Sequence, residues 1–348
     1  GTVTVNTTAS AGRYTDALLR RFAGRTESLW VGPDGTPRRQ VPGLRATAFL
    51  GDAAAETLFA GAPRAYADIR AEAAVAGGRP AGFALAGEAV FDVHTRRQDL
   101  PTANVIGLIE GSDPGLKSEY VVMTAHLDHL GIGGSGTDRI NNGALDNAGG
   151  VAAMLEAARM LAQDPPRRSV LVVALSAEEM GLLGSDYLAR FPVVTGVVAN
   201  VNLDMPILTY DFTDVVAFGA EHSTMGPLVA AAAETEDVSL SPDPMPEQNV
   251  FTRSDHYSFV QAGVPSVMLA TGYANGGEAA WGRFFADGYH KPNDDLSTPF
   301  NWSAAARFAR VNAAIARAIA DADRAPLWYE GNPYGDRFAP DAPRAPAP

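Results

Sequence analysis

The chain has no cysteine among its 348 residues, and this absence limits its metal chemistry. Disulfides and thiolate metal sites are excluded, so any metal ion must be bound by His, Asp or Glu. Histidine is also scarce, with six in the whole chain and none before His94. The first 82 residues are therefore an unfavourable place for a metal site.

An excess of positive charge and long apolar runs are also missing. The formal net charge of -13 argues against nucleic acid and anionic membranes as partners. No apolar run is long enough to span a membrane. The chain begins at Gly1 without Met or a signal peptide, and we interpret this as a truncated or processed N terminus. Its 46% hydrophobic content suits a globular protein with a sizeable core, and its length allows one large and one smaller domain.

Residues 1 to about 82 are weakly patterned and predict a smaller N-terminal α+β segment. A strand is expected at Thr2–Val5, and helices at Tyr14–Phe22 and Ala53–Ala60. The Gly- and Pro-containing stretch Gly77–Pro80 marks the boundary of this segment.

From Phe83 onwards, strand-like runs alternate with helical patterns. The predicted strands are Glu88–Val93, Ala103–Glu110, Tyr120–Ala125, Ser169–Leu175, Val197–Leu203 and Ser266–Ala270. The predicted helices are Val151–Gln163, Met180–Arg190, Met225–Glu234, His256–Gln261 and Ala304–Asp323. This alternation predicts an open α/β sheet covered by helices. The tail 329–348 is rich in Pro and Gly and predicts no regular structure.

Five polar motifs follow the strand-like runs or lie just beyond them: His126-Leu127-Asp128, Asp146-Asn147, Glu178-Glu179, Asp204 and Tyr289-His290. Ligands of open α/β sheets gather beyond the carboxyl ends of strands, so most of these motifs are expected at one rim. Their imidazoles and carboxylates suffice for two divalent metal ions, with one carboxylate left to act as a base. The pattern predicts metal-dependent hydrolysis.

Each motif taken alone also fits an ordinary structural role. Glu178 and Glu179 favour the positive end of a following helix. Asp146 and Asn147 are common helix-capping residues, and Asp204 is a common turn residue. The convergence of all the motifs at one rim favours the functional interpretation.

Residues 118–297, which carry these motifs, resemble the catalytic domain of the M28 family of zinc aminopeptidases, which includes secreted bacterial enzymes. The matching motifs are VMTAHLDH at 122–129, NGALDNAGG at 142–150, SAEEMGLLGS at 176–185, NLDM at 202–205, RSDHY at 253–257 and YHKPNDD at 289–295. The resemblance implies a three-layer open mixed sheet with helices on both faces, with residues 83–328 as a di-zinc peptidase domain. Residues 1–82 resemble the later part of a protease-associated domain, which would then be incomplete.

The resemblance also assigns the metal ligands. Asp146 would bridge two zinc ions, which cobalt or manganese could replace. His126 and Asp204 would complete one site, and Glu179 and His290 the other. A cis peptide bond between Asp146 and Asn147 is implied as well.

The remaining roles implied by the resemblance concern catalysis and substrate binding. Glu178 would be the general base, Asp128 would orient His126, and Tyr289 would donate a hydrogen bond to the developing oxyanion. Three further residues would line or support the pocket for the amino terminus of the substrate: Arg253, Ser254 and His256.

The implied reaction is the release of N-terminal amino acids from peptides with a free amino terminus, in a secreted or periplasmic bacterial enzyme. A dipeptidase or carboxypeptidase on the same fold stays open, although such enzymes bind a terminal carboxylate with guanidinium groups and only Arg253 lies beside the motifs. A glutaminyl-cyclase-like transferase would use one zinc ion, whereas retention of both His126 and Asp204 favours two. An inactive receptor-like homologue is disfavoured because every expected ligand is present.

Overall fold

The computed structural model of the chain describes residues 1–6, 26–38, 41, 43–133 and 136–348, so the helix predicted at 14–22 lies outside the described residues. Contacts divide the chain into two compact units, Gly1–Leu100 and Pro101–Pro348. The predicted boundary near residue 82 lies within residues 75–104, which form no helix or strand. The strand predicted at Glu88–Val93 is wrong. Val90 is 88% exposed, so its apolar side chain is not buried in a core.

The first unit is a small α+β structure. Strand β1 (Thr2–Val5) pairs in parallel with β2 (Thr47–Leu50), and the helices α3 (Asp52–Leu58) and α4 (Tyr66–Ala74) follow. The predicted strand at 2–5 and the predicted helix at 53–60 are confirmed. Tyr66 at the start of α4 is buried, and its hydroxyl donates to the backbone carbonyl of Asn6 over 2.7 Å.

The second unit is built on a seven-stranded mixed sheet with the order β10-β9-β11-β8-β4-β7-β3. Its strands are β3 (Val105–Ile109), β4 (Tyr120–His126), β7 (Ser169–Leu175), β8 (Val197–Leu203), β9 (Asp214–Phe218), β10 (Ser239–Ser241) and β11 (Ser266–Thr271). The four central strands β11, β8, β4 and β7 run parallel. The edge strand β3 is antiparallel to β7, and β9 is antiparallel to β11. This is the predicted open mixed sheet.

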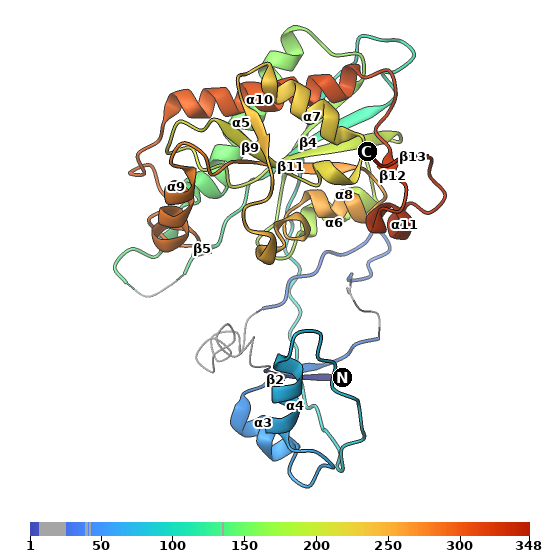
Figure 1. The fold of residues 1–348 in the computed structure, drawn as a ribbon, viewed down its shortest axis with the longest axis vertical. Helices are drawn as coiled ribbons and strands as arrows, with labels where there is room; N and C mark the ends of the chain where they lie inside the picture. Colours follow the sequence, from blue (N-terminus) through green and yellow to red (C-terminus); the bar gives the residue numbers. More distant parts are fainter. Residues whose placement is uncertain (7–25, 39–40, 42, 134–135) are drawn as a thin grey trace. The chain divides into compact units, whose positions relative to one another are not determined.

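Helices cover both faces of this sheet (Figure 1). One face carries α5 (Gly149–Gln163), α7 (Met225–Glu234) and α10 (Trp302–Asp321), and the other carries α6 (Leu183–Arg190) and α8 (His256–Gln261). Alternate residues of β4 reach the two sides, since Val121 and Met123 pack in the first core cluster and Val122 in the second. Strands buried on both faces are typical of parallel sheets, and the apolar run of β4 fits that position.

The C-terminal segment is ordered, contrary to the prediction for the tail. It forms β12 (Trp328–Tyr329), α11 (Pro333–Phe338) and β13 (Arg344–Ala345). The Asn332 side chain caps α11 by accepting from the backbone N–H groups of its first turn, and Pro333 occupies the first helical position. Proline and glycine here define the ends of a helix and its turns, so their abundance does not prevent regular structure.

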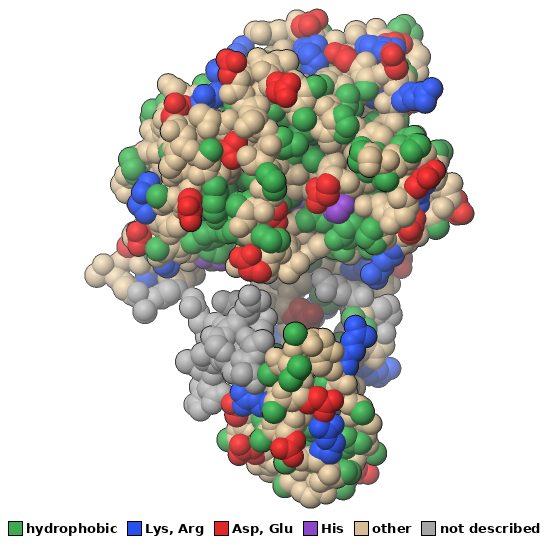
Figure 2. Space-filling model, in the orientation of Figure 1, with side chains coloured by type: hydrophobic (Ala, Val, Ile, Leu, Met, Phe, Trp, Pro, Cys, Tyr) green, Lys and Arg blue, Asp and Glu red, His purple; other side chains and the backbone are tan. Residues whose placement is uncertain are grey.

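The remaining short elements of the second unit lie in its loops. They are β5 (Gly131–Ile132), β6 (Ile140–Asn141), α9 (Gly277–Arg283), the π-helical turns η1 (Ala144–Ala148) and η5 (Phe284–Gly288), and the 3-10 turns η2 (Ala220–His222), η3 (Pro246–Gln248) and η4 (Val250–Thr252). Among the described residues, no helix has the length and apolar character needed to cross a membrane. Figure 2 shows acidic and basic side chains interspersed over the visible face.

Candidate metal centre

Three neighbouring parallel strands end at the same rim of the sheet, and each brings acidic or imidazole groups there. His126 is the last residue of β4, Glu178 follows shortly after β7, and Asp204 directly follows β8. Strand β4 pairs in parallel with both β7 and β8, so the three carboxyl ends lie side by side. His126 Nε2 lies 3.1 Å from Asp204 Oδ1.

Asp146 lies between two groups of side chains and turns a different carboxylate oxygen towards each. Its Oδ1 is 3.3 Å from His126 Nε2, and its Oδ2 is 3.4 Å from His290 Nε2. His290 Nε2 is also 3.3 Å from Glu179 Oε2. The structure therefore brings the five predicted ligands together in two groups that share Asp146.

A further histidine, His129, belongs to this cluster, although its place in the sequence suggested no role. Its Nδ1 lies 2.7 Å from Glu179 Oε1. Two sets of three residues could each bind a metal ion, because the potential ligand atoms within each set lie within 4.8 Å of one another. One set is His126, Asp146 and Asp204, and the other is His129, Asp146 and Glu179. One indication of this role was available in the sequence. His129 directly follows Asp128, in the same motif as His126.

The loop that carries Asp146 is held from a distant part of the chain. The carboxylate of Asp294 accepts hydrogen bonds from the backbone N–H groups of Leu145, over 2.8 Å, and of Asp146, over 3.0 Å. The Asp146–Asn147 peptide bond is cis, as predicted. The Asp146 side chain is only 4% exposed, so it faces the cluster and not bulk solvent.

Asp128 supports the centre differently from the prediction. His126 Nδ1 lies 3.0 Å from the backbone carbonyl oxygen of Asp128, but 4.0 Å from its carboxylate. That carboxylate instead accepts from the backbone N–H groups of Glu178 and Glu179, over 3.0 and 3.3 Å. Asp128 thus orients His126 through its main chain, and its side chain fixes the turn that carries the two glutamates.

Burial and neighbouring charges control ionisation in the cluster. Burial raises the pKa of Glu178 to about 10, and the charge of Asp204 adds to this effect. Burial likewise raises the pKa of Tyr289 to about 12. Burial also opposes ionisation of Asp146, but hydrogen bonds to its two histidine neighbours outweigh it and hold the pKa of Asp146 below its usual value. Such a concentration of buried carboxylates and imidazoles favours a bound cation.

A model described as Peptidase family M28 matches residues 104–316, which is more than half of the chain. The chain belongs to peptidase family M28. The matched range contains every predicted site residue, from His126 to His290.

Individual M28-like relatives match shorter stretches. The aminopeptidase YwaD of Bacillus subtilis is 29% identical over 189 residues, 51% of this chain and 36% of that protein. A probable zinc metalloprotease of Pyrenophora tritici-repentis is 39% identical over 89 residues, 25% of this chain and 18% of that protein. The solved structure of BSAP, a zinc aminopeptidase from Bacillus subtilis, covers 66% of this chain and 53% of its own chain at 25% identity, with a TM-score of 0.49. The chain spans less than half of both curated relatives and about half of that structure.

The three substrate-pocket residues expected in the M28 domain occupy different environments. Ser254 is 3% exposed, and its Oγ donates to Asp204 Oδ2 over 2.5 Å, so it lies behind the cluster. His256 is fully buried, and neither of its ring nitrogens has a hydrogen-bond partner among the described residues. Only Arg253 is exposed, and its Nη1 donates to the backbone carbonyl of Gln248 over 3.4 Å.

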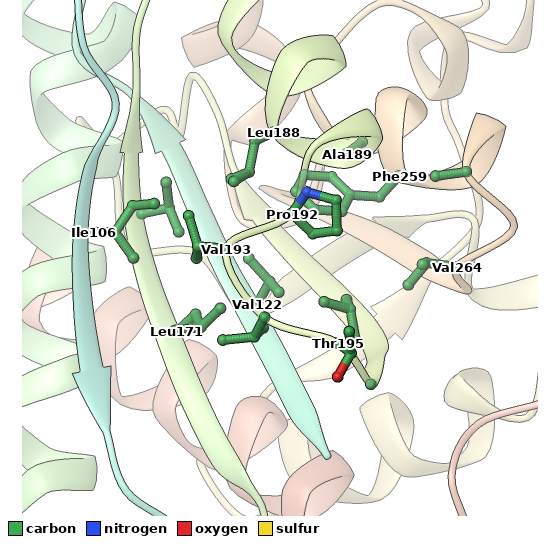
Figure 3. Close-up of a pocket in the computed structure, with 15 residues that line it drawn as sticks. Ile106, Val122, Leu171, Leu188, Ala189, Pro192, Val193, Thr195, Phe259 and Val264 are labelled. Carbon is green, nitrogen blue, oxygen red and sulfur yellow. The ribbon is translucent and has the colours of Figure 1, made fainter. Parts of the chain in front are cut away.

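An apolar cavity of about 330 Å³ lies elsewhere in the M28 domain, between the sheet and the helices α6 and α8 (Figure 3). Its lining includes Ile106, Val122, Leu171, Leu188, Phe259 and Val264. Val122 and Leu171 lie in the first half of their strands, away from the rim that carries His126. Among the described residues, no carboxylate or imidazole lines this cavity, so it offers no candidate metal ligand.

Proposed function

We propose that this chain is a metal-dependent aminopeptidase that binds two zinc ions and releases single amino acids from free peptide amino termini. The observation that carries the proposal is the position of Asp146, whose two oxygens face two separate groups of imidazole and carboxylate ligands. Two cations bound there supply an activated water and polarise the scissile carbonyl. Mixed imidazole and carboxylate ligands suit zinc, and cobalt or manganese can replace it. Two of the relatives are described as a probable zinc metalloprotease and a zinc aminopeptidase, and these descriptions support zinc as the metal.

Two residues that lie outside both ligand groups carry the proton chemistry in this proposal. The positive charge of two bound cations would lower the pKa of Glu178 from about 10, so that its carboxylate would take a proton from the attacking water and transfer it to the leaving amine. Tyr289 donates a hydrogen bond to the carbonyl oxygen as negative charge develops on it. Because the pKa of Tyr289 is about 12, its hydroxyl keeps its proton at neutral pH. Asp128 keeps Glu178 in place through the backbone hydrogen bond described above.

The preference for a free amino terminus follows from charge. The buried carboxylates of Glu178 and Asp204 attract an ammonium group and thereby select which carbonyl reaches the centre. A carboxypeptidase or dipeptidase needs a guanidinium group for the terminal carboxylate. Arg253 is the arginine nearest in sequence to the motifs, and it donates to a backbone carbonyl instead.

The test compares an aminoacyl anilide with its N-acetyl counterpart. We expect the acetyl group to lower kcat/KM far more than a change of side chain does, because acetylation removes the positive charge and adds bulk. Equal cleavage of both substrates, or release of residues from the carboxyl end, would replace this proposal with the carboxypeptidase alternative.

A glutaminyl-cyclase-like transferase is the second candidate, and it differs in metal content. Such an enzyme needs one zinc ion, and the two groups of potential ligands among the described residues support two ions instead. An inactive receptor-like homologue would bind no catalytic metal. Elemental analysis of the purified protein separates the three cases, and we expect two zinc ions per chain.

Two further parts of the proposal rest on the sequence resemblance. Residues 83–328 would be the catalytic domain, and residues 1–82 would be the later part of a protease-associated domain. A secreted or periplasmic bacterial location belongs to the same resemblance. Activity measured in separated periplasmic, cytoplasmic and culture fractions of the source organism tests the location.

A further inference from the structure

His129 has an environment that its neighbours in the protein do not explain. Its side chain is only 7% exposed, and that of Glu179 is 8% exposed. Among the described residues, neither ring nitrogen of His129 has a hydrogen-bond partner, and neither does Glu179 Oε1. Buried polar atoms without partners are rare in folded proteins, because each one costs the free energy of its lost hydration.

The contact between the two residues is close, although it is not a hydrogen bond. His129 Nδ1 and Glu179 Oε1 approach to 2.7 Å, yet their relative orientation does not satisfy hydrogen-bond geometry. Both atoms can therefore offer a lone pair to a cation beside them. Asp146 also belongs to this group, since one potential ligand atom from each of His129, Asp146 and Glu179 lies within 4.8 Å of the other two.

The ring of His129 is restrained in this position. Gly143 packs against it so closely that a Cβ at residue 143 would lie 2.8 Å from His129 Cγ. The ring of His290 packs edge-to-face against the ring of His129, with 5.7 Å between the two centroids. An alanine at residue 143 would displace the His129 ring, which agrees with a function that depends on its orientation.

We propose that His129 is a sixth protein ligand of the metal centre and binds the ion on the Glu179 side. This inference rests on the proposed function and extends it. The Glu179 side then carries two imidazoles, His129 and His290, and the other side carries one, His126. Because imidazole suits zinc and copper better than magnesium or calcium, the Glu179 side binds zinc more tightly than the His126 side does.

The absence of cysteine from the chain allows a direct spectroscopic test. A cysteine that binds cobalt loses its thiol proton and gives a thiolate-to-cobalt charge-transfer band in the near ultraviolet. The His129→Cys variant loaded with two equivalents of Co²⁺ should show this band. The control is Ser118→Cys, an exposed position before β4 at the end of the strand opposite to the rim, which should show none.

Affinity measurements separate ligation from a hydrogen bond to Glu179. In competition with a chelator, His129→Ala should weaken one of the two zinc equivalents by at least about 10-fold and leave the other within about 3-fold. His129→Cys should restore the weakened equivalent, whereas His129→Gln, which keeps an N–H donor, should not. Restoration by Gln, or a cobalt-loaded His129→Cys without the band, would overturn the inference in favour of a positioning role.

The same measurements distinguish the failure of this inference from the failure of the proposed function. Wild-type protein that binds fewer than two ions per chain would overturn both. Wild-type protein that binds two ions, together with a His129→Ala variant that binds both as tightly, would overturn only the role of His129. The affinity of His129→Ala for zinc tests the role of His129 even if His129→Cys does not fold.

Discussion

Asp146 is positioned by its main chain, which leaves its side chain free to face both ligand groups. The carboxylate of Asp294 holds the backbone N–H groups on one side of the loop. On the other side, Asn147 Nδ2 donates to the carbonyl of Leu203 over 3.0 Å, at the end of β8. These hydrogen bonds connect the loop to two parts of the centre that are distant in sequence, and they hold it from both sides.

Asp146→Asn should therefore lower the occupancy of both metal sites. The substitution keeps the backbone bonds of the loop and removes the negative charge that both ions would share. Elemental analysis after dialysis measures the result, and Asp164→Asn, at a side chain that is 87% exposed, is the matched control. If only one ion were lost, Asp146 would serve a single site and would not bridge two.

Glu178→Gln should retain both metal ions and lose about 100- to 10,000-fold in kcat, the usual range for removal of a general acid-base. An amide has nearly the same shape as the carboxylate but accepts no proton. Steady-state kinetics with an aminoacyl anilide measure the loss. Glu156→Gln, on the exposed surface of α5, should leave kcat unchanged. Loss of metal from the Glu178 variant would assign that residue to the ligands instead.

At this scale, the sequence predicted which residues meet but not how each one contacts its neighbours. His126 and Asp204 were predictable because a residue at the end of a parallel strand reaches the same rim whatever its rotamer. The role of Asp128 depends on how it contacts His126. The His126 Nδ1 atom lies 3.0 Å from the Asp128 carbonyl oxygen and 4.0 Å from its carboxylate, and the spacing of residues in a sequence does not encode this difference. His129 was missed for the same reason, since only the fold of its turn brings it to Glu179.

At the scale of elements, His222 is one of the side chains that hold the final helix α11, together with Phe251 and Tyr257. Asn332 caps α11 with its Oδ1, and its Nδ2 donates to His222 Nδ1 over 3.1 Å. His222 Nδ1 must therefore accept, which requires the neutral imidazole. The ring of His222 also packs against Tyr334 of α11 and against Phe251, at 4.9 and 4.7 Å between centroids.

This attachment should weaken in acid. Burial lowers the pKa of His222 below its usual value, so the folded state keeps this histidine neutral while the unfolded chain takes up a proton below about pH 6.5. The contribution to stability is complete above that pH and is lost as the pH falls towards the folded-state pKa. The melting temperature of His222→Gln should fall less between pH 7.5 and 5.5 than that of the wild type.

The exposed His94 provides the control for this comparison, because its side chain is 94% exposed. His94→Gln should show the same acid dependence as the wild type. An identical decline in the wild type and His222→Gln would show that α11 does not depend on the neutral imidazole.

Elements with a strong apolar pattern were predicted well, and elements held by distant contacts were not. The predicted limits of β7 and β8 match the structure to the residue, since both strands are rich in valine and leucine. Strand β9 begins with the buried Asp214, whose carboxylate is held by the Ser241 hydroxyl and the backbone of Ala274. Its apolar run Val215–Phe218 is short and follows a charged residue, so the strand was missed. In the tail, α11 likewise depends on partners outside the helix, such as His222.

At the scale of the whole molecule, the residues needed for the proposed chemistry all belong to one of the two compact units. All five predicted ligands and Glu178 lie within the unit Pro101–Pro348. The stretch between α4 and β3 has no helix or strand, and most of its side chains from residue 84 to 100 are exposed. An exposed stretch without secondary structure is a preferred site for proteolysis.

Limited digestion with trypsin should therefore cut first after Arg96 or Arg97 and leave the second unit intact. Arg97 makes an exposed ion pair with Asp99, a contact that contributes little to stability and does not protect the backbone. Mass spectrometry should identify a fragment that begins at residue 97 or 98, retains two zinc ions and cleaves an aminoacyl anilide within about 3-fold of the intact chain. The double variant Arg96→Gln, Arg97→Gln should delay this cut without changing activity. Early cleavage between residues 126 and 290, or loss of metal from the fragment, would mean that the catalytic unit depends on residues before Pro101.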